Sequence, residues 1–192
     1  MSLTGGTLYV LCTGAYIANR TSDKLTPVAD RIYTCRSGSA ADTQAMSDYV
    51  RLYLGHYMAD TGKEPTVHVA AHLFSSISYG NKNRLCAGII CAGWDEELGG
   101  QVYSIPVYSG ALIRQPISIS GSGSSYVYGY VDANFREGMS KDECESFCKN
   151  TVSLAMGRDG SSGGIIRMAT ITKEGVNKVY IPHQELPVHW QG

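Results

Sequence analysis

The order of apolar and polar residues predicts strands and helices that come in blocks. Short runs rich in β-branched and aromatic residues predict strands at residues 7–12 and 32–36. Residues 39–60 then follow the three- and four-residue spacing of a helix, with Ser39 as the expected N-cap. The residues that recur at this spacing are Ala41, Ala45, Tyr49, Leu52, Tyr53 and His56. A second helix is predicted over residues 66–79.

The second half of the chain predicts three more strands, two helices and a final hairpin. The expected strands cover residues 85–94, 101–107 and 111–120, the expected helices cover 124–137 and 141–156, and the hairpin strands cover 164–172 and 177–181. Ser140 and Glu143 form the S-x-x-E pattern of a capping box. Because strands and helices come in blocks, a doubly wound parallel sheet is disfavoured. The pattern instead predicts an α+β fold, a four-layer αββα sandwich of two antiparallel sheets with a helix pair on each outer face.

Composition is that of an ordinary globular protein. Hydrophobic residues make up 43% of the 192 residues and charged residues 17%, which argues against disorder. A formal net charge of −1 gives no electrostatic reason to expect nucleic acid or a membrane as partner. We find no interdomain linker, so residues 1–192 are expected to form a single domain. No apolar run is long enough to span a bilayer, and the first residues lack the features of a secretory signal. We therefore expect a protein of the cytoplasm and nucleus.

Cysteines and histidines give no support for a metal site. Six cysteines stand at positions 12, 35, 86, 91, 144 and 148 without a C-x-x-C pair, and they are expected to be reduced thiols. His68 and His72 are four apart on a predicted helix, but the glutamate of the H-E-x-x-H motif is absent. A packed or surface histidine pair is the better interpretation, and we predict no metal.

Five segments carry a more specific signal than periodicity. They are YIANRTSDKLTP at 16–27, RSGSAADTQ at 36–44, AGWDEELGGQVYSIP at 92–106, GSGSSYVYGYVD at 121–132 and RDGSSGG at 158–164. In this order and spacing they resemble the β subunits of the proteasome core particle, and most closely the caspase-like type that cuts after acidic residues. The resemblance runs from about residue 14 to residue 181.

This resemblance implies a fold, an activity and a set of partners. The fold is that of the N-terminal-nucleophile hydrolases, and the activity is a threonine-type endopeptidase in ATP- and ubiquitin-dependent protein degradation. The implied partners are other proteasome β and α subunits in heptameric rings, with unfolded polypeptides as substrates. No cofactor is implied.

Several residues match positions that act in catalysis in this family. There, an N-terminal threonine attacks the peptide carbonyl, and its own α-amine acts as general base. Lys24 matches the lysine whose positive charge lowers the pKa of the attacking hydroxyl. Gly38 matches the glycine whose backbone N–H donates to the oxyanion, and Arg36 matches a basic residue that lines the specificity pocket. Taken without the resemblance, Lys24 and Arg36 are typical of surface cations, and Gly38 of a turn.

Three further residues match the family at the threonine amine. Ser122, in GSGSS, matches the serine near this amine, and Asp159 and Ser162, in RDGSSGG, match the D-x-x-S pair that orients the threonine. Taken alone, these residues are typical of turns or helix ends. A separate hydrolase with Ser122 as its nucleophile is disfavoured, because Gly121-Ser122-Gly123 lacks the G-x-S-x-G spacing.

Residues 1–13 depart from the family pattern. An active member runs from its threonine through a hairpin that carries Gly-Gly and Gly-Ala-Asp-Ser-Arg, whereas here MSLTGGTLYVLC leads directly into TGAYIANR. Gly6-Thr7 resembles the processing junction, which makes Thr7 the candidate nucleophile. The path from Thr7 to Gly14 extends over at most about 25 Å, too short for a strand, a turn and a return strand.

Three explanations of this departure stay open. The sequence could come from a transcript or gene prediction that lacks an exon, from a naturally inactive variant, or from an artificial N-terminal segment. Loss of a central hairpin would remove hydrogen-bond partners from one sheet, so we expect a chain that folds poorly or does not join the particle. The alternative function is a non-catalytic structural β subunit.

Overall fold

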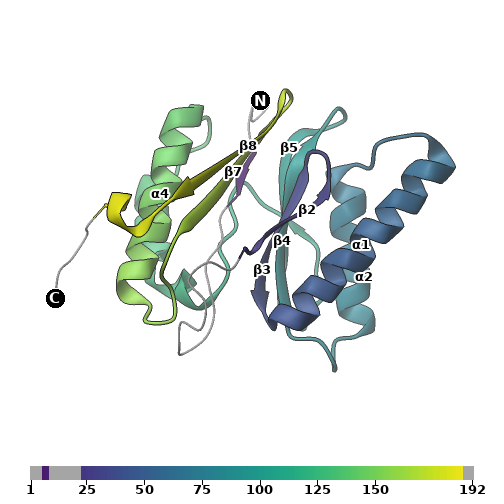
Figure 1. The fold of residues 1–192 in the computed structure, drawn as a ribbon, viewed down its shortest axis with the longest axis horizontal. Coiled ribbons are helices and arrows are strands. Elements are labelled where there is room, and N and C mark those ends of the chain that lie inside the picture. The colour runs from purple at the N-terminus through teal and green to yellow at the C-terminus, as the bar shows by residue number, and fades with distance from the viewer. Residues whose placement is uncertain (1–5, 9–22, 188–192) are drawn as a thin grey trace.

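The computed structural model describes residues 6–8 and 23–187, which form two antiparallel sheets stacked between layers of helices (Figure 1). One sheet has the strand order β1-β7-β8 and the other β2-β3-β4-β5-β6. The strands are β1 (Gly6–Leu8), β2 (Leu25–Ala29), β3 (Ile32–Gly38), β4 (Ala87–Asp95), β5 (Gly99–Ile105), β6 (Ile113–Arg114), β7 (Ile166–Thr172) and β8 (Gly175–Ile181). The helices are α1 (Ala40–Thr61), α2 (Val67–Gly80), α3 (Tyr128–Asn134) and α4 (Lys141–Arg158), with 3-10 helices η1 (Ser122–Tyr126) and η2 (His183–Glu185).

Helices α1 and α2 cover the outer face of the five-stranded sheet, and α4 with α3 covers the outer face of the three-stranded sheet (Figure 1). Every strand pair within the two sheets is antiparallel. The predicted α+β fold, a four-layer αββα sandwich, is therefore confirmed. Within the described residues, no helix has the length and apolar character needed to cross a membrane.

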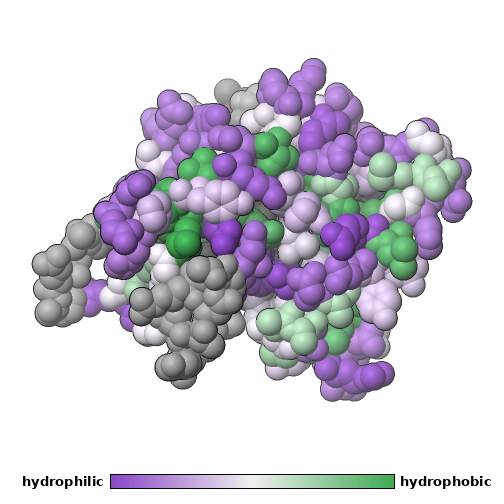
Figure 2. Space-filling model, viewed as in Figure 1, coloured by the Kyte–Doolittle hydropathy of each residue, from purple (hydrophilic) through white to green (hydrophobic). Residues whose placement is uncertain are grey.

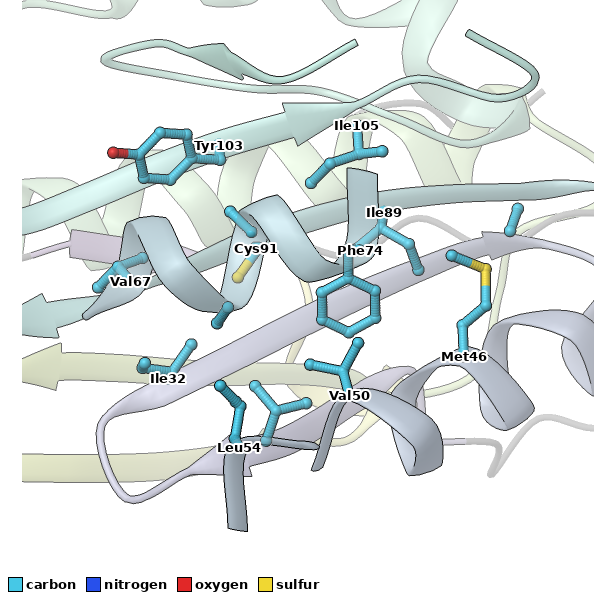
Figure 3. Packing of buried hydrophobic residues seen from close by; sticks show 14 residues of the cluster. Ile32, Met46, Val50, Leu54, Val67, Phe74, Ile89, Cys91, Tyr103 and Ile105 are labelled. Carbon is cyan, nitrogen blue, oxygen red and sulfur yellow. The ribbon is translucent and has the colours of Figure 1, made fainter. Parts of the chain in front are cut away.

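Helix α1 carries two apolar stripes, one buried and one exposed. Met46, Val50 and Leu54 are at most 2% exposed and pack with Phe74 of α2 against the five-stranded sheet (Figure 3). The stripe that predicts this helix from the sequence is the exposed one, in which Tyr49, Leu52 and Tyr53 are more than half exposed. The predicted helix is thus confirmed, but the residues that face the core are not the ones on which the prediction is based. The surface in Figure 2 is correspondingly mixed, with hydrophobic areas separated by hydrophilic ones.

The two sheets pack together through a buried cluster that contains both small and large side chains. This inter-sheet cluster consists of Leu25, Tyr33, Cys35, Ile90, Ala92, Ala169 and Ile171, all of them buried. Ala92 on β4 and Ala169 on β7 are at most 1% exposed. Burial raises the pKa of the Cys35 thiol, with a further contribution from the nearby Cys91. Cys35 therefore stays a protonated, packing thiol, as expected from the sequence.

Two segments differ from their sequence prediction. The strand expected over 111–120 is reduced to β6, and Pro116, which has no N–H to donate, lies just beyond it. The helix expected over 124–137 is divided between η1 and α3, with Val127 at φ −117° and ψ −5° between them. Strand β2 was not predicted, since its exposed Pro27 interrupts the apolar run.

The helix caps agree with the sequence. The Ser39 hydroxyl accepts from the Asp42 N–H at 3.3 Å at the start of α1. At the start of α4, the Ser140 N–H donates to Glu143 Oε2 at 2.9 Å, and the Glu143 N–H donates to Ser140 Oγ at 3.4 Å. The predicted capping box is therefore present. Of the strand expected at 7–12, the first two residues belong to β1, and the remainder lies outside the described residues.

Candidate functional site

Three of the candidate residues meet at the Asp159 carboxylate, at the C-terminal end of α4. The Ser122 hydroxyl donates to Asp159 Oδ2 at 2.6 Å, and the Ser162 hydroxyl donates to the same oxygen at 2.5 Å. The Ser161 N–H donates to Asp159 Oδ1 at 3.1 Å. Asp159 and Ser162 are only 6% and 5% exposed. Both oxygens of a buried carboxylate are thus satisfied by donors from η1 and from the turn after α4.

These hydrogen bonds decide the charge state of Asp159. Burial by itself would raise the pKa of this carboxyl group, but the bonds donated by Ser122, Ser162 and Ser161 outweigh it and lower the pKa below its ordinary value. Asp159 is therefore ionised at neutral pH and accepts from every neighbouring hydroxyl. Such a cluster can hold a cationic amine or fix a hydroxyl in one orientation.

Gly38 ends β3 in a conformation that suits only glycine. Its φ is +95°, and a Cβ built on it would lie 2.4 Å from the backbone oxygen of Cys86. The same oxygen accepts from the Ser39 N–H at 2.8 Å. The backbone therefore turns sharply from β3 into α1 at this position.

Lys24 lies at the same end of the five-stranded sheet as Gly38. The backbone oxygen of Lys24 accepts from the Arg36 N–H at 3.2 Å, which places Lys24 beside the last residues of strand β3. The preceding residue, Asp23, accepts from the Leu25 N–H at 2.9 Å and forms an ion pair of 3.7 Å with Arg167 of β7. Asp23 thus connects the Lys24 segment to the opposite sheet.

The Arg36 guanidinium is anchored on two sides. Its Nη2 donates to the Asp23 backbone oxygen at 2.9 Å, and its Nη1 donates to Thr43 Oγ1 at 3.3 Å. Its Nε is buried and has no partner among the described residues. Burial lowers the pKa of Arg36, while the carboxylates of Asp23 and Asp48 act in the opposite direction. A partly buried guanidinium that two acceptors hold in place is suited to attract an anionic group.

Thr7 lies in β1, at the edge of the three-stranded sheet. Its backbone pairs with Thr170 of β7 in an antiparallel register. Thr170 is three residues further along β7 than Arg167, which corresponds to about 10 Å. The structure therefore brings Ser122, Asp159 and Ser162 into direct contact and puts Lys24, Arg36 and Gly38 at one sheet end, whereas the Thr7 backbone lies further along β7.

Sequence reasoning missed three residues that support this arrangement, namely Asp23, Ser37 and Ser120. Asp23 precedes Lys24 and Ser37 precedes Gly38, so their proximity to candidate residues was the available signal. Ser37 Oγ and Ser120 Oγ are 2.9 Å apart. No sequence pattern predicts this contact, because the two serines are 83 residues apart in the chain.

A separate hollow of about 150 Å³ lies at the other end of β3. Its lining includes Arg31, Glu64, Trp94 and Glu96. Arg31 stacks over the Trp94 ring at 4.7 Å and pairs with Glu96 at 3.8 Å, so these side chains partner one another. Within the described part of the chain, no three His, Cys, Asp or Glu side chains gather as a metal site.

The sequence matches a known family over most of its length. Residues 10–171 match the family model described as Proteasome subunit. The chain therefore belongs to the proteasome subunit family, and its two-sheet sandwich is that of the N-terminal-nucleophile hydrolases. It is a β-type member, since its relatives carry β-type names.

Three relatives illustrate this. Proteasome subunit beta type-6 of Dictyostelium discoideum is 56% identical over 180 residues, which cover 94% of this chain and 84% of that protein. Probable proteasome subunit beta type-1 of Schizosaccharomyces pombe is 55% identical over 167 residues, 87% of this chain and 74% of that protein. Proteasome subunit beta type-1 of Saccharomyces cerevisiae is 52% identical over 167 residues, 87% of this chain and 77% of that protein.

Proposed function

We propose that this β subunit assembles with other α and β subunits into the heptameric rings of the proteasome core particle and carries a threonine-type endopeptidase site that cleaves after acidic residues. The single observation that carries the proposal is the Ser122–Asp159–Ser162 cluster, with its ionised, buried carboxylate. The family membership supports the same site, because the cluster falls on motif positions identified in the sequence. Cytoplasm and nucleus are the proposed compartments, with unfolded polypeptides as substrates.

The proposed chemistry requires a free amine at Thr7. Cleavage of the Gly6–Thr7 bond would release this amine, which takes the proton from the Thr7 hydroxyl as that oxygen attacks the substrate carbonyl. The Gly38 N–H then donates to the oxyanion, and the Lys24 ammonium stabilises the developing negative charge. As the intermediate collapses, the protonated Thr7 amine gives its proton to the leaving nitrogen, which departs as the new amine terminus and leaves an ester on Thr7. Water then hydrolyses this ester, releases the new carboxyl terminus and restores the Thr7 hydroxyl. The Ser122–Asp159–Ser162 cluster orients the Thr7 amine.

Arg36 supports the preference for acidic residues. Its guanidinium is held by Asp23 and Thr43 while its Nε lacks a partner among the described residues. The positive charge that these two acceptors hold in place would attract a substrate carboxylate.

A second candidate is a non-catalytic or inactive truncated β subunit. The observation that favours it is the pairing of the Thr7 backbone with Thr170. This pairing sets Thr7 about 10 Å along β7 from Arg167, the residue that pairs with Asp23 beside Lys24, and therefore away from the candidate lysine. The departure of residues 1–13 from the family pattern, interpreted from the sequence as a missing hairpin, supports the same alternative.

The mature N-terminus discriminates between the two candidates. The full chain should be co-expressed with partner subunits, and the purified particle analysed by intact mass and by labelling with a threonine-directed covalent inhibitor. The matched control is the Thr7→Ala chain in the same particle. A terminus at Thr7 and labelling that Thr7→Ala abolishes would support the endopeptidase. A retained Met1 without labelling would support the structural subunit. Failure to enter the particle would overturn the proposed assembly and would agree with the expectation, from the sequence, of a truncated chain that does not join it.

A further inference from the structure

Two serine hydroxyls meet over a glycine between β3, β4 and the segment that leads into η1. Ser37 Oγ lies 2.9 Å from Ser120 Oγ and donates to the Gly88 backbone oxygen at 3.1 Å. Because the Ser37 proton is used on Gly88, the proton between the two serines comes from Ser120. Hydroxyl chains of this kind polarise one another and strengthen each bond.

Gly88 provides the space for this contact. A Cβ built on Gly88 would lie 2.6 Å from Ser37 Oγ, 3.0 Å from Val107 Cγ2 and 3.5 Å from Ser120 Oγ. The glycine of β4 thus lets a strand residue and a loop residue approach each other across its backbone. Ser37 is 8% exposed, so its hydroxyl has little access to water as a substitute partner.

The contact connects the two halves of the candidate site. The sheet-side half is Lys24, Arg36 and Gly38, and the helix-side half is Ser122, Asp159 and Ser162. Ser37 immediately precedes Gly38, at the sheet-side half. Ser120 is two residues before Ser122, which donates to Asp159 at the helix-side half. In this region the strand predicted over 111–120 is replaced by irregular backbone after β6, so side-chain contacts contribute to its position. The Ser37–Ser120 bond is one such contact, and it lies within two residues of both halves.

We propose that Ser120 is a positioning residue: by donating to Ser37 across Gly88, its hydroxyl sets the separation between the Gly38 N–H and the Ser122–Asp159–Ser162 cluster. The inference rests on the proposed endopeptidase function and names a residue that holds its geometry. Ser120 acts through its neighbours and does not touch the substrate. A shift of about 1 Å in such a spacing can lower a rate up to roughly 100-fold.

The test replaces Ser120 by Ala or by Thr in the full chain, assembled with its partner subunits. Ser125→Ala is the control, since it removes an exposed hydroxyl from the same segment. Hydrolysis of a fluorogenic peptide with glutamate before the scissile bond gives kcat and KM. We expect Ser120→Ala to lower kcat roughly tenfold with KM within about twofold, because the oxyanion forms only in the transition state. Ser120→Thr should restore kcat, and Ser125→Ala should leave it unchanged.

A second background and a second measurement complete the test. In a Ser37→Ala chain, Ser120→Ala should have no further effect, because the acceptor is already gone. Deuterium uptake should rise in the peptides around residues 36–40 and 118–127 in Ser120→Ala but not in Ser125→Ala, whether or not the particle hydrolyses peptides.

The outcomes separate the two ideas. Unchanged uptake and unchanged kcat in Ser120→Ala overturn the positioning role while leaving the endopeptidase intact. Altered uptake with an inactive wild-type particle supports the tie between the two halves but overturns the proposed function and, with it, the catalytic positioning. Equal losses in Ser120→Ala and Ser120→Thr, or a rise in KM alone, also overturn the role of the hydroxyl.

Discussion

Ser122 donates to the Asp159 carboxylate at 2.6 Å, although the two residues are 37 positions apart in the chain. One belongs to η1 and the other caps the end of α4. Since Ser162 shares the same oxygen, Asp159 is the centre on which both serines depend. Changes at Asp159 should therefore affect stability and site geometry together.

Replacing Asp159 by Asn should destabilise the fold by about 1–3 kcal/mol, because an amide cannot accept from three donors as a carboxylate does. The lowered pKa of Asp159 gives the pH dependence. Its stabilising contribution is complete above the unfolded-state pKa of about 3.9 and is lost as pH falls through the lower folded-state value. Urea unfolding from pH 3 to 7 should show the difference between the two chains shrink below about pH 4. Asp132→Asn, at an exposed position on α3, is the control; a difference independent of pH would contradict the assignment.

Gly38→Ala should cost about 2–4 kcal/mol, because φ is +95° and the new Cβ would press on the Cys86 backbone oxygen. Gly55 offers a matched control, since it lies on α1 with nothing within 4 Å of a built Cβ. Gly55→Ala should be neutral or stabilise by up to about 1 kcal/mol. Thermal unfolding of both chains measures the contrast, and equal effects would refute the structural requirement at Gly38.

Arg36→Gln should reduce cleavage after glutamate roughly tenfold and leave cleavage after a neutral residue nearly unchanged. The reason is loss of the cation that Asp23 and Thr43 hold at this end of β3. Arg31→Gln removes the same charge at the opposite end of the strand and should not alter the ratio. Paired fluorogenic peptides report this ratio, and a parallel fall for both substrates would exclude a role in specificity.

Ser140→Ala should destabilise the protein by about 1 kcal/mol, because it removes the hydroxyl that accepts from the Glu143 N–H. Ser140→Asp should recover much of this, since an aspartate also caps a helix. Denaturant unfolding measures both changes. No loss with Ala would mean that the box contributes little beyond the tertiary packing of α4.

The helical layers and most strands follow from sequence periodicity, because their apolar spacing has a direct geometric meaning. The same reasoning does not select the buried face of α1, where Tyr49 and Tyr53 form an exposed stripe about 100° around the helix from Val50 and Leu54. Both stripes have helical spacing, so only the tertiary contacts decide which one enters the core.

The site itself depended on family resemblance. The contacts of Ser122 with Asp159 and of Ser37 with Ser120 join residues 37 and 83 positions apart, and no local pattern encodes such distances. The irregular segment after β6 was also missed as such. Its alternating apolar residues are typical of a strand, but Pro116 and the serine contact prevent a continued ladder.

The small side chains between the two sheets influence the geometry of the site from a distance, because they help to set the spacing of the sheets. Ala92 and Ala169 are fully enclosed where β4 and β7 face each other. A leucine at either position would act as a wedge and push the two sheets apart. Gly38 ends a strand of one sheet, and Asp159 caps the helix that covers the other sheet. The two residues would then move apart although neither had been substituted. The size of these two side chains therefore helps to set the distance between the two groups of site residues.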